Sequence, residues 1–151
     1  MPDFTPYRES YAAVPEAHWA YLAGVIDGEG SIYVCYDKRH DIYFIEMSVA
    51  NTARSLIEWL LENFGGTEKL SGRAERDGCP DQWAWVVRGR KAAPIIAGIM
   101  PYLVVKQRQA ALAEEFLSTY IADKERSVKN QDRLRIKEAI GTLNCLKGKA
   151  R

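Results

Sequence analysis

The sequence predicts a single α+β domain, and three observations support this fold class. The chain has 151 residues, a length that suits one hydrophobic core. Segments with apolar residues at helical spacing alternate with pairs of segments rich in β-branched and aromatic residues. Short polar or turn-rich segments join the members of each pair, which indicates hairpins. The predicted order of elements is α-β-β-α-β-β-α-α-α.

The first half of the chain is predicted to contain a helix, a hairpin and a second helix. Residues 15–27 begin with Pro15 and Glu16, which favour a helix start, and we expect Gly28 and Gly30 to end this helix with a sharp turn. Residues 31–36 and 42–50 have the composition of paired strands. Alternation along the second strand directs Tyr43, Ile45, Met47 and Val49 inward and Ile42, Phe44, Glu46 and Ser48 outward. Residues 51–64 have helical periodicity and stop at two glycines.

The second half is predicted to contain another hairpin and three helices. Residues 67–73 and 82–88 flank a turn-rich segment, and we expect Trp83 and Trp85 to fill the core. The helices are predicted over residues 94–100, 106–121 and 131–146, with Val105, Leu112 and Phe116 facing inward.

The charge is unevenly distributed along the chain. The formal net charge is only +1, which argues against a uniformly basic nucleic-acid binder. Residues 124–151, however, hold nine Lys or Arg and three acids. A segment with this local charge can bind phosphates, and a solvated helix face with a basic tail is the alternative.

The composition gives no sign of secretion or of a membrane span. Cys35, Cys79 and Cys145 are odd in number and lie 44 and 66 positions apart, which suits neither a disulfide framework nor a zinc site. The longest apolar runs are interrupted by Pro101, and residues 1–10 have no apolar stretch. We therefore expect a soluble intracellular protein without a membrane partner, in a host compartment that the sequence leaves open.

The first predicted helix has a stripe of small residues. Ala17, Ala20, Gly24 and, on a flank, Ala23 recur at helical spacing, so a second helix can approach closely. If the same helix of a second subunit makes this contact about a two-fold axis, two copies of Glu29 come together. We therefore expect these four residues to form a homodimer interface.

Residues 21–30 read Tyr-Leu-Ala-Gly-Val-Ile-Asp-Gly-Glu-Gly. This segment resembles the signature of the LAGLIDADG homing endonucleases, and the order of predicted elements agrees with that family over about residues 15–120. The resemblance implies an αββαββα core with a four-stranded antiparallel DNA-binding sheet in each subunit. A glycine-rich helix stop with two solvated acids is the alternative interpretation of residues 27–30.

The resemblance also implies a divalent-metal site and its catalytic residues. Glu29 and Gly28 would bind the metal, and Glu29, Lys106 and Asn51 would be catalytic. The implied cofactor is Mg²⁺, two or three ions per dimer, with Mn²⁺ or Ca²⁺ as substitutes for binding. As alternatives, Lys106 is an ordinary lysine in the first turn of a helix and Asn51 is the N-cap of the helix that follows it.

In the resembled family, one face of the sheet lies along the major groove of DNA. Arginine suits guanine, glutamine suits adenine and acids can accept from cytosine, whereas Arg39, Arg76 and the basic C-terminal segment would bind phosphates. The outward residues implied to contact DNA are Ser31, Tyr33, Cys35, Asp37, Ile42, Phe44, Glu46, Ser48, Lys69, Ser71, Arg73, Gln82, Ala84, Val86 and Arg88.

The function expected from the resemblance is that of an intron-encoded, site-specific endonuclease. It would cut double-stranded DNA at a long pseudo-palindromic target as a homodimer, with no small-molecule substrate. Residues 1–14 are expected to form an N-terminal extension, residues 15–122 the endonuclease core and residues 123–151 a basic C-terminal helical segment of the same domain. An intron RNA-binding splicing maturase and a catalytically silent DNA-binding protein of the same fold remain as alternatives.

Overall fold

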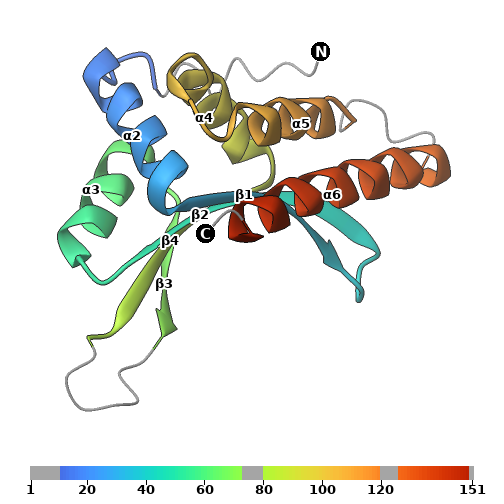
Figure 1. Ribbon diagram of the computed structural model, residues 1–151, viewed down its shortest axis with the longest axis horizontal. Coiled ribbons are helices and arrows are strands. Elements are labelled where there is room, and N and C mark those ends of the chain that lie inside the picture. The colour runs from blue at the N-terminus through green and yellow to red at the C-terminus, as the bar shows by residue number, and fades with distance from the viewer. Residues whose placement is uncertain (1–10, 73–79, 120–125, 150–151) are drawn as a thin grey trace.

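A computed structural model describes residues 11–72, 80–119 and 126–149, and these residues form an α+β fold (Figure 1). The helices are α2 (Glu16–Glu29), α3 (Arg54–Phe64), α4 (Ala92–Ile99), α5 (Gln107–Ser118) and α6 (Arg126–Lys149), with the 3-10 helices η1 (Gly89–Lys91) and η2 (Met100–Tyr102). None of the described helices is both long and apolar enough to span a membrane.

Four strands form one antiparallel sheet in the order β1-β2-β4-β3. They are β1 (Gly30–Asp37), β2 (Ile42–Asn51), β3 (Thr67–Gly72) and β4 (Gln82–Arg88). The two predicted hairpins are thereby confirmed, and β2 and β4 are the inner strands. Helix α2 packs against β1 and β2, α3 packs against β4, and α6 packs against α5 and β1.

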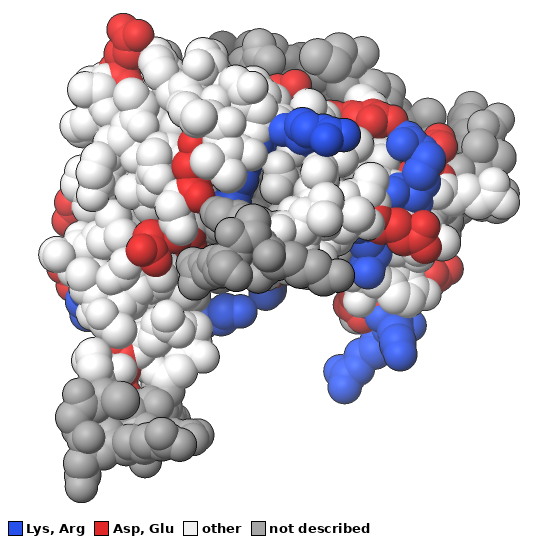
Figure 2. All heavy atoms as spheres, viewed as in Figure 1, with Lys and Arg blue, Asp and Glu red and all other residues white. Residues whose placement is uncertain are grey.

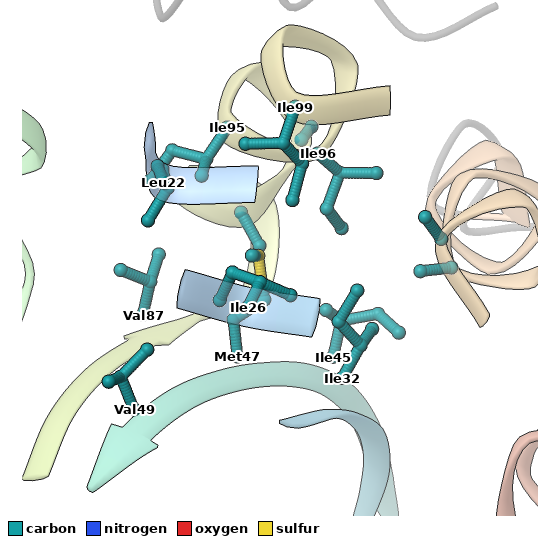
Figure 3. Packing of buried hydrophobic residues seen from close by; sticks show 14 of the residues in the cluster. Leu22, Ile26, Ile32, Ile45, Met47, Val49, Val87, Ile95, Ile96 and Ile99 are labelled. Carbon is teal, nitrogen blue, oxygen red and sulfur yellow. The ribbon is translucent and has the colours of Figure 1, made fainter. Parts of the chain in front are cut away.

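The core lies between α2, α4 and the inner face of the sheet (Figure 3). Leu22 and Ile26 of α2 point toward side chains of α4 and of the sheet, and both are fully buried. Burial of an aliphatic side chain of this size contributes about 1.5–3 kcal/mol, so these contacts fix the rotation of α2 on the sheet. The predicted inward positions of β2 are confirmed for Ile45, Met47 and Val49, which are fully buried, whereas Tyr43 is half-buried.

The end of α2 differs from the prediction. The helix continues through Gly28 to Glu29, and β1 begins at the next residue. Gly30 has extended backbone, with φ −91° and ψ 170°, so the expectation of a sharp glycine turn is wrong. Gly30 is required for a different reason, because a Cβ there would lie 2.7 Å from the Cα of Ile26.

Two further differences lie in the second half of the chain. Val105 is 55% exposed, contrary to the prediction, because α5 begins only at Gln107 and residues 103–106 are not helical. Helix α6 begins five residues before the predicted start, since residues 126–130 show no apolar periodicity from which a helix could be inferred. Trp85 is fully buried as expected, whereas Trp83 is half-buried beneath the guanidinium of Arg54.

Candidate active site at the end of helix α2

Glu29 is the last residue of α2 and immediately precedes β1. Its side chain is exposed. The buried contacts of Leu22 and Ile26 hold the other side of the helix against the core. No hydrogen bond or ion pair joins the Glu29 carboxylate to any residue that the structure describes. The carboxylate is therefore held by a rigid helix end and is free to bind an external group.

Asp27 binds backbone amides from a segment far away in the sequence. Its carboxylate accepts hydrogen bonds from the N–H groups of Val104 (2.8 Å), Val105 (3.2 Å) and Lys106 (2.9 Å). These groups precede or begin α5, where backbone N–H groups lack partners within the helix. Asp27 therefore serves mainly to join α2 to the start of α5.

Lys106 lies at the same helix end, and only 2% of it is exposed. Its Nζ donates hydrogen bonds to the backbone carbonyl oxygens of Ile26, Asp27 (3.2 Å) and Gly30 (2.5 Å). Carbonyls at a helix C-terminus lack partners within the helix, and a positive charge there is favourable. The structure thus brings Lys106 to the segment that carries Glu29, but its ammonium group faces backbone carbonyls. Its catalytic role remains a prediction.

Asn51 ends β2 and pairs with Trp83 of β4. Its Oδ1 accepts a hydrogen bond from the backbone N–H of Ala53 at 2.8 Å. Because α3 begins at Arg54 with Ala53 at its N-cap position, the alternative that Asn51 is the N-cap is wrong. In the sheet register Gly30 lies opposite Val49, so the end of β2 is adjacent to the junction of α2 and β1.

The oxygen donors at this helix end suit a hard divalent cation only in part. The Glu29 carboxylate and the Gly28 carbonyl are ligands of the kind that Mg²⁺ prefers. Within the described residues, however, no group of three or more His, Cys, Asp or Glu side chains is placed to hold a metal ion. Asp27 is occupied by three backbone amides. One chain therefore offers a fitting but incomplete ligand set.

The outer side of α2 is exposed and carries three small residues beside the larger Tyr21. Ala17, Ala20 and Gly24 are exposed, and a Cβ added at Gly24 would have no heavy atom within 4 Å. The prediction that Ala23 contacts a second subunit is wrong, because Ala23 is fully buried in the core of its own chain. A helix turns by about 100° per residue, so Ala23 faces away from the side on which Gly24 lies.

The predicted DNA-binding residues lie mainly on the sheet face opposite the core. Figure 2 shows that the molecule is hollowed on this side, with some Lys and Arg side chains at the edge of the hollow and at the β1–β2 hairpin and others over α5 and α6. Arg39 is exposed in the turn of that hairpin. The residues that are exposed or half-exposed, as expected, are Ser31, Tyr33, Cys35, Asp37, Ile42, Phe44, Ser48, Lys69, Ser71, Gln82 and Arg88. Arg73 and Arg76 lie outside the described residues.

Three of the predicted contact residues are buried. Ala84 and Val86 are each only 3% exposed, because they lie on an inner strand whose neighbours on both sides cover small side chains. Glu46 is also 3% exposed. The prediction that these three side chains contact bases directly is therefore wrong.

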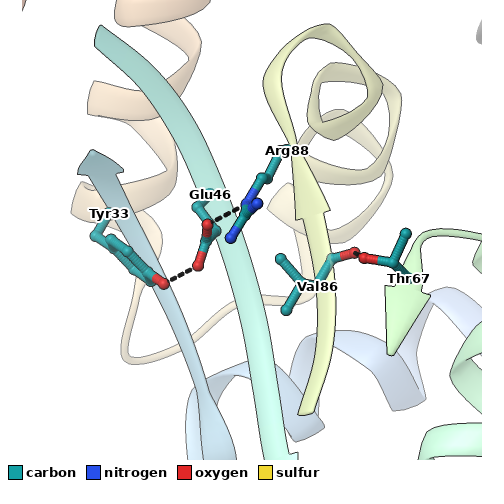
Figure 4. Close-up of polar contacts among 5 residues, drawn as sticks. All are labelled: Tyr33, Glu46, Thr67, Val86 and Arg88. Carbon is teal, nitrogen blue, oxygen red and sulfur yellow. Dashed lines mark hydrogen bonds and ion pairs between the residues drawn. The ribbon is translucent and has the colours of Figure 1, made fainter. Parts of the chain in front are cut away.

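Glu46 joins two other outward side chains (Figure 4). It accepts a hydrogen bond from the Tyr33 hydroxyl and forms an ion pair with Arg88, whose Nε lies 2.5 Å from Oε2. Burial and the bond to Glu46 raise the pKa of the Tyr33 hydroxyl well above its usual value. Burial, together with the charge of Glu46, raises the pKa of the Cys35 thiol to about 11. Alternation in the sequence predicted the face of these residues but not their pairing.

Several solved structures share this fold. The homing endonuclease I-CvuI in complex with its target superposes with a TM-score of 0.71 at 20% identity, over 85% of this chain and 82% of that chain. The archaeal intron-encoded homing endonuclease I-Vdi141I complexed with DNA gives 0.67 at 19% identity, over 85% and 84%. The LAGLIDADG meganuclease I-AabMI bound to uncleaved DNA gives 0.66 at 17% identity, over 79% of this chain but 43% of that chain.

No protein-family model and no curated sequence matches the chain. The structural matches show that the chain has the LAGLIDADG homing endonuclease fold, with its four-stranded antiparallel sheet. The fold class and the resemblance inferred from residues 21–30 are thus confirmed at the level of the fold.

Proposed function

We propose that this chain is a divalent-metal-dependent DNA endonuclease of the LAGLIDADG homing type, which cuts both strands of a long pseudo-palindromic target as a homodimer. The observation that carries the proposal is the exposed Glu29 carboxylate, which has no partner in the described chain and lies between a core-packed helix and the first strand of the sheet. Structures that share the fold were solved with DNA targets.

The free face of the sheet has the dimensions and chemistry to bind duplex DNA. Three spacings between four strands give a width of about 14 Å, close to the roughly 12 Å of the major groove. The face combines the cations Lys69 and Arg88 with the neutral donor Gln82 and the aromatic residue Tyr33. Such a mixture can both bind phosphates and distinguish base edges.

The outer side of α2 supports the homodimer. Gly24 offers open space for the backbone of a second helix. Tyr21 is 54% exposed and Val104 is 84% exposed, so large apolar side chains lie on α2 and on the segment bound to its end. Exposed apolar surface of this kind commonly marks an interface. A two-fold axis along this helix side would add a second Glu29 to the incomplete ligand set.

In the proposed dimer, Glu29 and the Gly28 carbonyl of each chain would hold the divalent ions. When bound, Mg²⁺ would supply a water of lowered pKa and would stabilise negative charge on the leaving oxygen. Lys106 and Asp27 would keep the helix end, and with it Glu29, in a fixed position. Asn51 would bind solvent or phosphate from the adjacent end of β2.

The test is a cleavage assay on a plasmid library with randomised inserts in the presence of Mg²⁺. We expect the wild-type chain to linearise a subset of targets. Glu29→Gln should bind the selected DNA but cut it at least about 100-fold more slowly, a loss typical of removing one charged group from a catalytic site. Glu62→Gln on α3, which also replaces an exposed glutamate, is the matched control and should cut like the wild type.

Two results would overturn the proposal. Cleavage by Glu29→Gln at the wild-type rate would remove Glu29 from the reaction. A wild-type chain that binds the selected duplex and leaves it intact with both Mg²⁺ and Mn²⁺ would instead support the catalytically silent alternative.

A further inference from the structure

Three polar side chains form a row across the outer face of the sheet. Tyr33 of β1 lies opposite Glu46 of β2, and Glu46 lies opposite Arg88 of β4. All three project on the same side, and their polar ends meet (Figure 4). The row therefore links three adjacent strands through side chains as well as through the backbone.

Glu46 is positioned to orient its neighbours and not to contact a ligand. One carboxylate oxygen accepts from the Tyr33 hydroxyl, and the other accepts from Nε of Arg88. Only 3% of the residue is exposed. A carboxylate this far removed from water requires partners for both oxygens, and here it has them.

Arg88 has the complementary arrangement. Its side chain is 57% exposed, and only Nε is used by Glu46. The guanidinium also lies over the ring of Phe44, with 5.9 Å between Cζ and the ring centroid. Neither terminal nitrogen makes a hydrogen bond with the described residues. The two terminal NH₂ groups thus present parallel donors from a guanidinium that is held on two sides.

We infer that Arg88 reads a guanine in the major groove and that Glu46 and Tyr33 are positioning residues that fix its guanidinium. The inference rests on the proposed function, in which this sheet face binds duplex DNA. Guanine is the base that presents two acceptors, O6 and N7, side by side in the major groove, and two parallel N–H donors match them. A two-fold dimer would require this guanine once in each half of the target.

The alternative is that the ion pair between Glu46 and Arg88 only stabilises the fold. The experiment must separate this effect from recognition of a base. Removal of Arg88 would leave the buried Glu46 carboxylate without its cation, which destabilises a protein whatever its function. The informative variant is therefore Arg88→Lys, which keeps the charge beside Glu46 but loses the planar pair of donors. Arg108→Lys is the matched control, because Arg108 is an exposed arginine on α5 and lies outside the sheet that carries the row.

The experiment is selection of bound targets from randomised duplex DNA in Ca²⁺, followed by sequencing, with urea unfolding of each variant alongside. The wild type should enrich guanine at one pair of symmetry-related positions. Arg88→Lys should lower that preference by about 5-fold to about 100-fold, the range expected for loss of one bidentate base contact. Glu46→Gln should lower it in the same positions, Tyr33→Phe by less, and Arg108→Lys should leave every base preference unchanged.

Either of two outcomes would overturn the inference. The first is an Arg88→Lys or Glu46→Gln variant with altered unfolding but an unchanged guanine preference, which would assign the row to stability alone. The second is a wild type that binds duplex DNA in a salt-dependent manner without the guanine preference. That result would leave the proposed DNA binding intact, whereas a wild type that binds no duplex would remove the proposed function as well.

Discussion

Asp27 and Lys106 each bind the backbone of the other. The Asp27 carboxylate accepts from the N–H of Lys106 at 2.9 Å, and the Lys106 ammonium donates to the carbonyl of Asp27 at 3.2 Å. One side chain satisfies amides at the start of α5, and the other satisfies carbonyls at the end of α2. The two helix ends are therefore joined by a reciprocal cap directly before Glu29.

Lys106→Met tests this cap. The variant keeps most of the apolar stem but leaves three carbonyl oxygens without their charged donor, so we expect the free energy of unfolding to fall by about 2 kcal/mol or more. Urea unfolding measures the change. Lys38→Met in the exposed β1–β2 turn is the control and should stay within about 0.5 kcal/mol of the wild type. Equal stability of the two variants would contradict the cap.

Gly28 and Gly30 should respond in opposite directions to alanine. Gly28 lies within α2 and has open space around it, so Gly28→Ala should stabilise the free chain by up to about 1 kcal/mol. Gly30→Ala places a Cβ against the Cα and Cδ1 of Ile26 and should destabilise by about 1–3 kcal/mol. Thermal unfolding of both variants distinguishes these effects, and a shift of the same sign in both would show that the junction is described wrongly.

Gly24→Leu should separate folding from dimerisation. A Cβ at this position has no heavy atom of its own chain within 4 Å, so the fold should persist, but the leucine would fill the space needed by a partner helix. We expect the dimer dissociation constant to rise at least about tenfold, which requires a loss of only about 1.4 kcal/mol. Analytical ultracentrifugation over a range of concentrations measures it. Gly141→Leu on exposed α6 is the matched control, and an unchanged dimer in Gly24→Leu would move the interface elsewhere.

Stability should decline at alkaline pH. The pKa of Cys35 is raised from 9.0 to about 11, chiefly by burial, so the folded state favours the uncharged thiol. This contribution is complete below about pH 9 and is lost as the pH rises toward 11. The pKa of Tyr33 is shifted in the same direction, again mainly by burial. Urea midpoints between pH 8 and 11 should therefore fall, and Cys35→Ser should make the fall shallower. A Cys35→Ser profile parallel to that of the wild type would contradict this assignment.

Local sequence patterns predicted most of the fold. Alternation identified the buried face of β2 through Ile45, Met47 and Val49, and paired strands around turn-rich segments indicated both hairpins. The errors occur where tertiary contacts override local signals. Gly28 has the composition of a helix stop, yet the helix continues because Lys106, 78 positions later, satisfies its last carbonyls. Spacing in the sequence cannot reveal such a distant partner.

The sequence predicted only part of the candidate site, because the other part depends on contacts between residues far apart in the chain. The motif identified Glu29 as an exposed acid at the helix end, and the structure places Lys106 and Asn51 near the same junction. The reciprocal cap joins α2 to the start of α5, and the ion pair between Glu46 and Arg88 joins β2 to β4. Both contacts link residues that are far apart in the sequence. Helical spacing alone also placed Ala23 at the edge of the dimer interface. In the structure Ala23, one residue before Gly24, is fully buried in the core.

Strand β1 begins directly after α2, and the Lys106 ammonium donates to a carbonyl on each side of this junction, so a tilt of α2 would be passed on to β1. Strand β1 spans eight residues, or about 26 Å, so tilting α2 by about 10° would displace the far end of the hairpin by about 4–5 Å. That is more than the roughly 3.4 Å rise of one base-pair step. In the proposed dimer, the crossing angle of two small-residue helices would therefore set how far apart the two halves of a recognised sequence must lie.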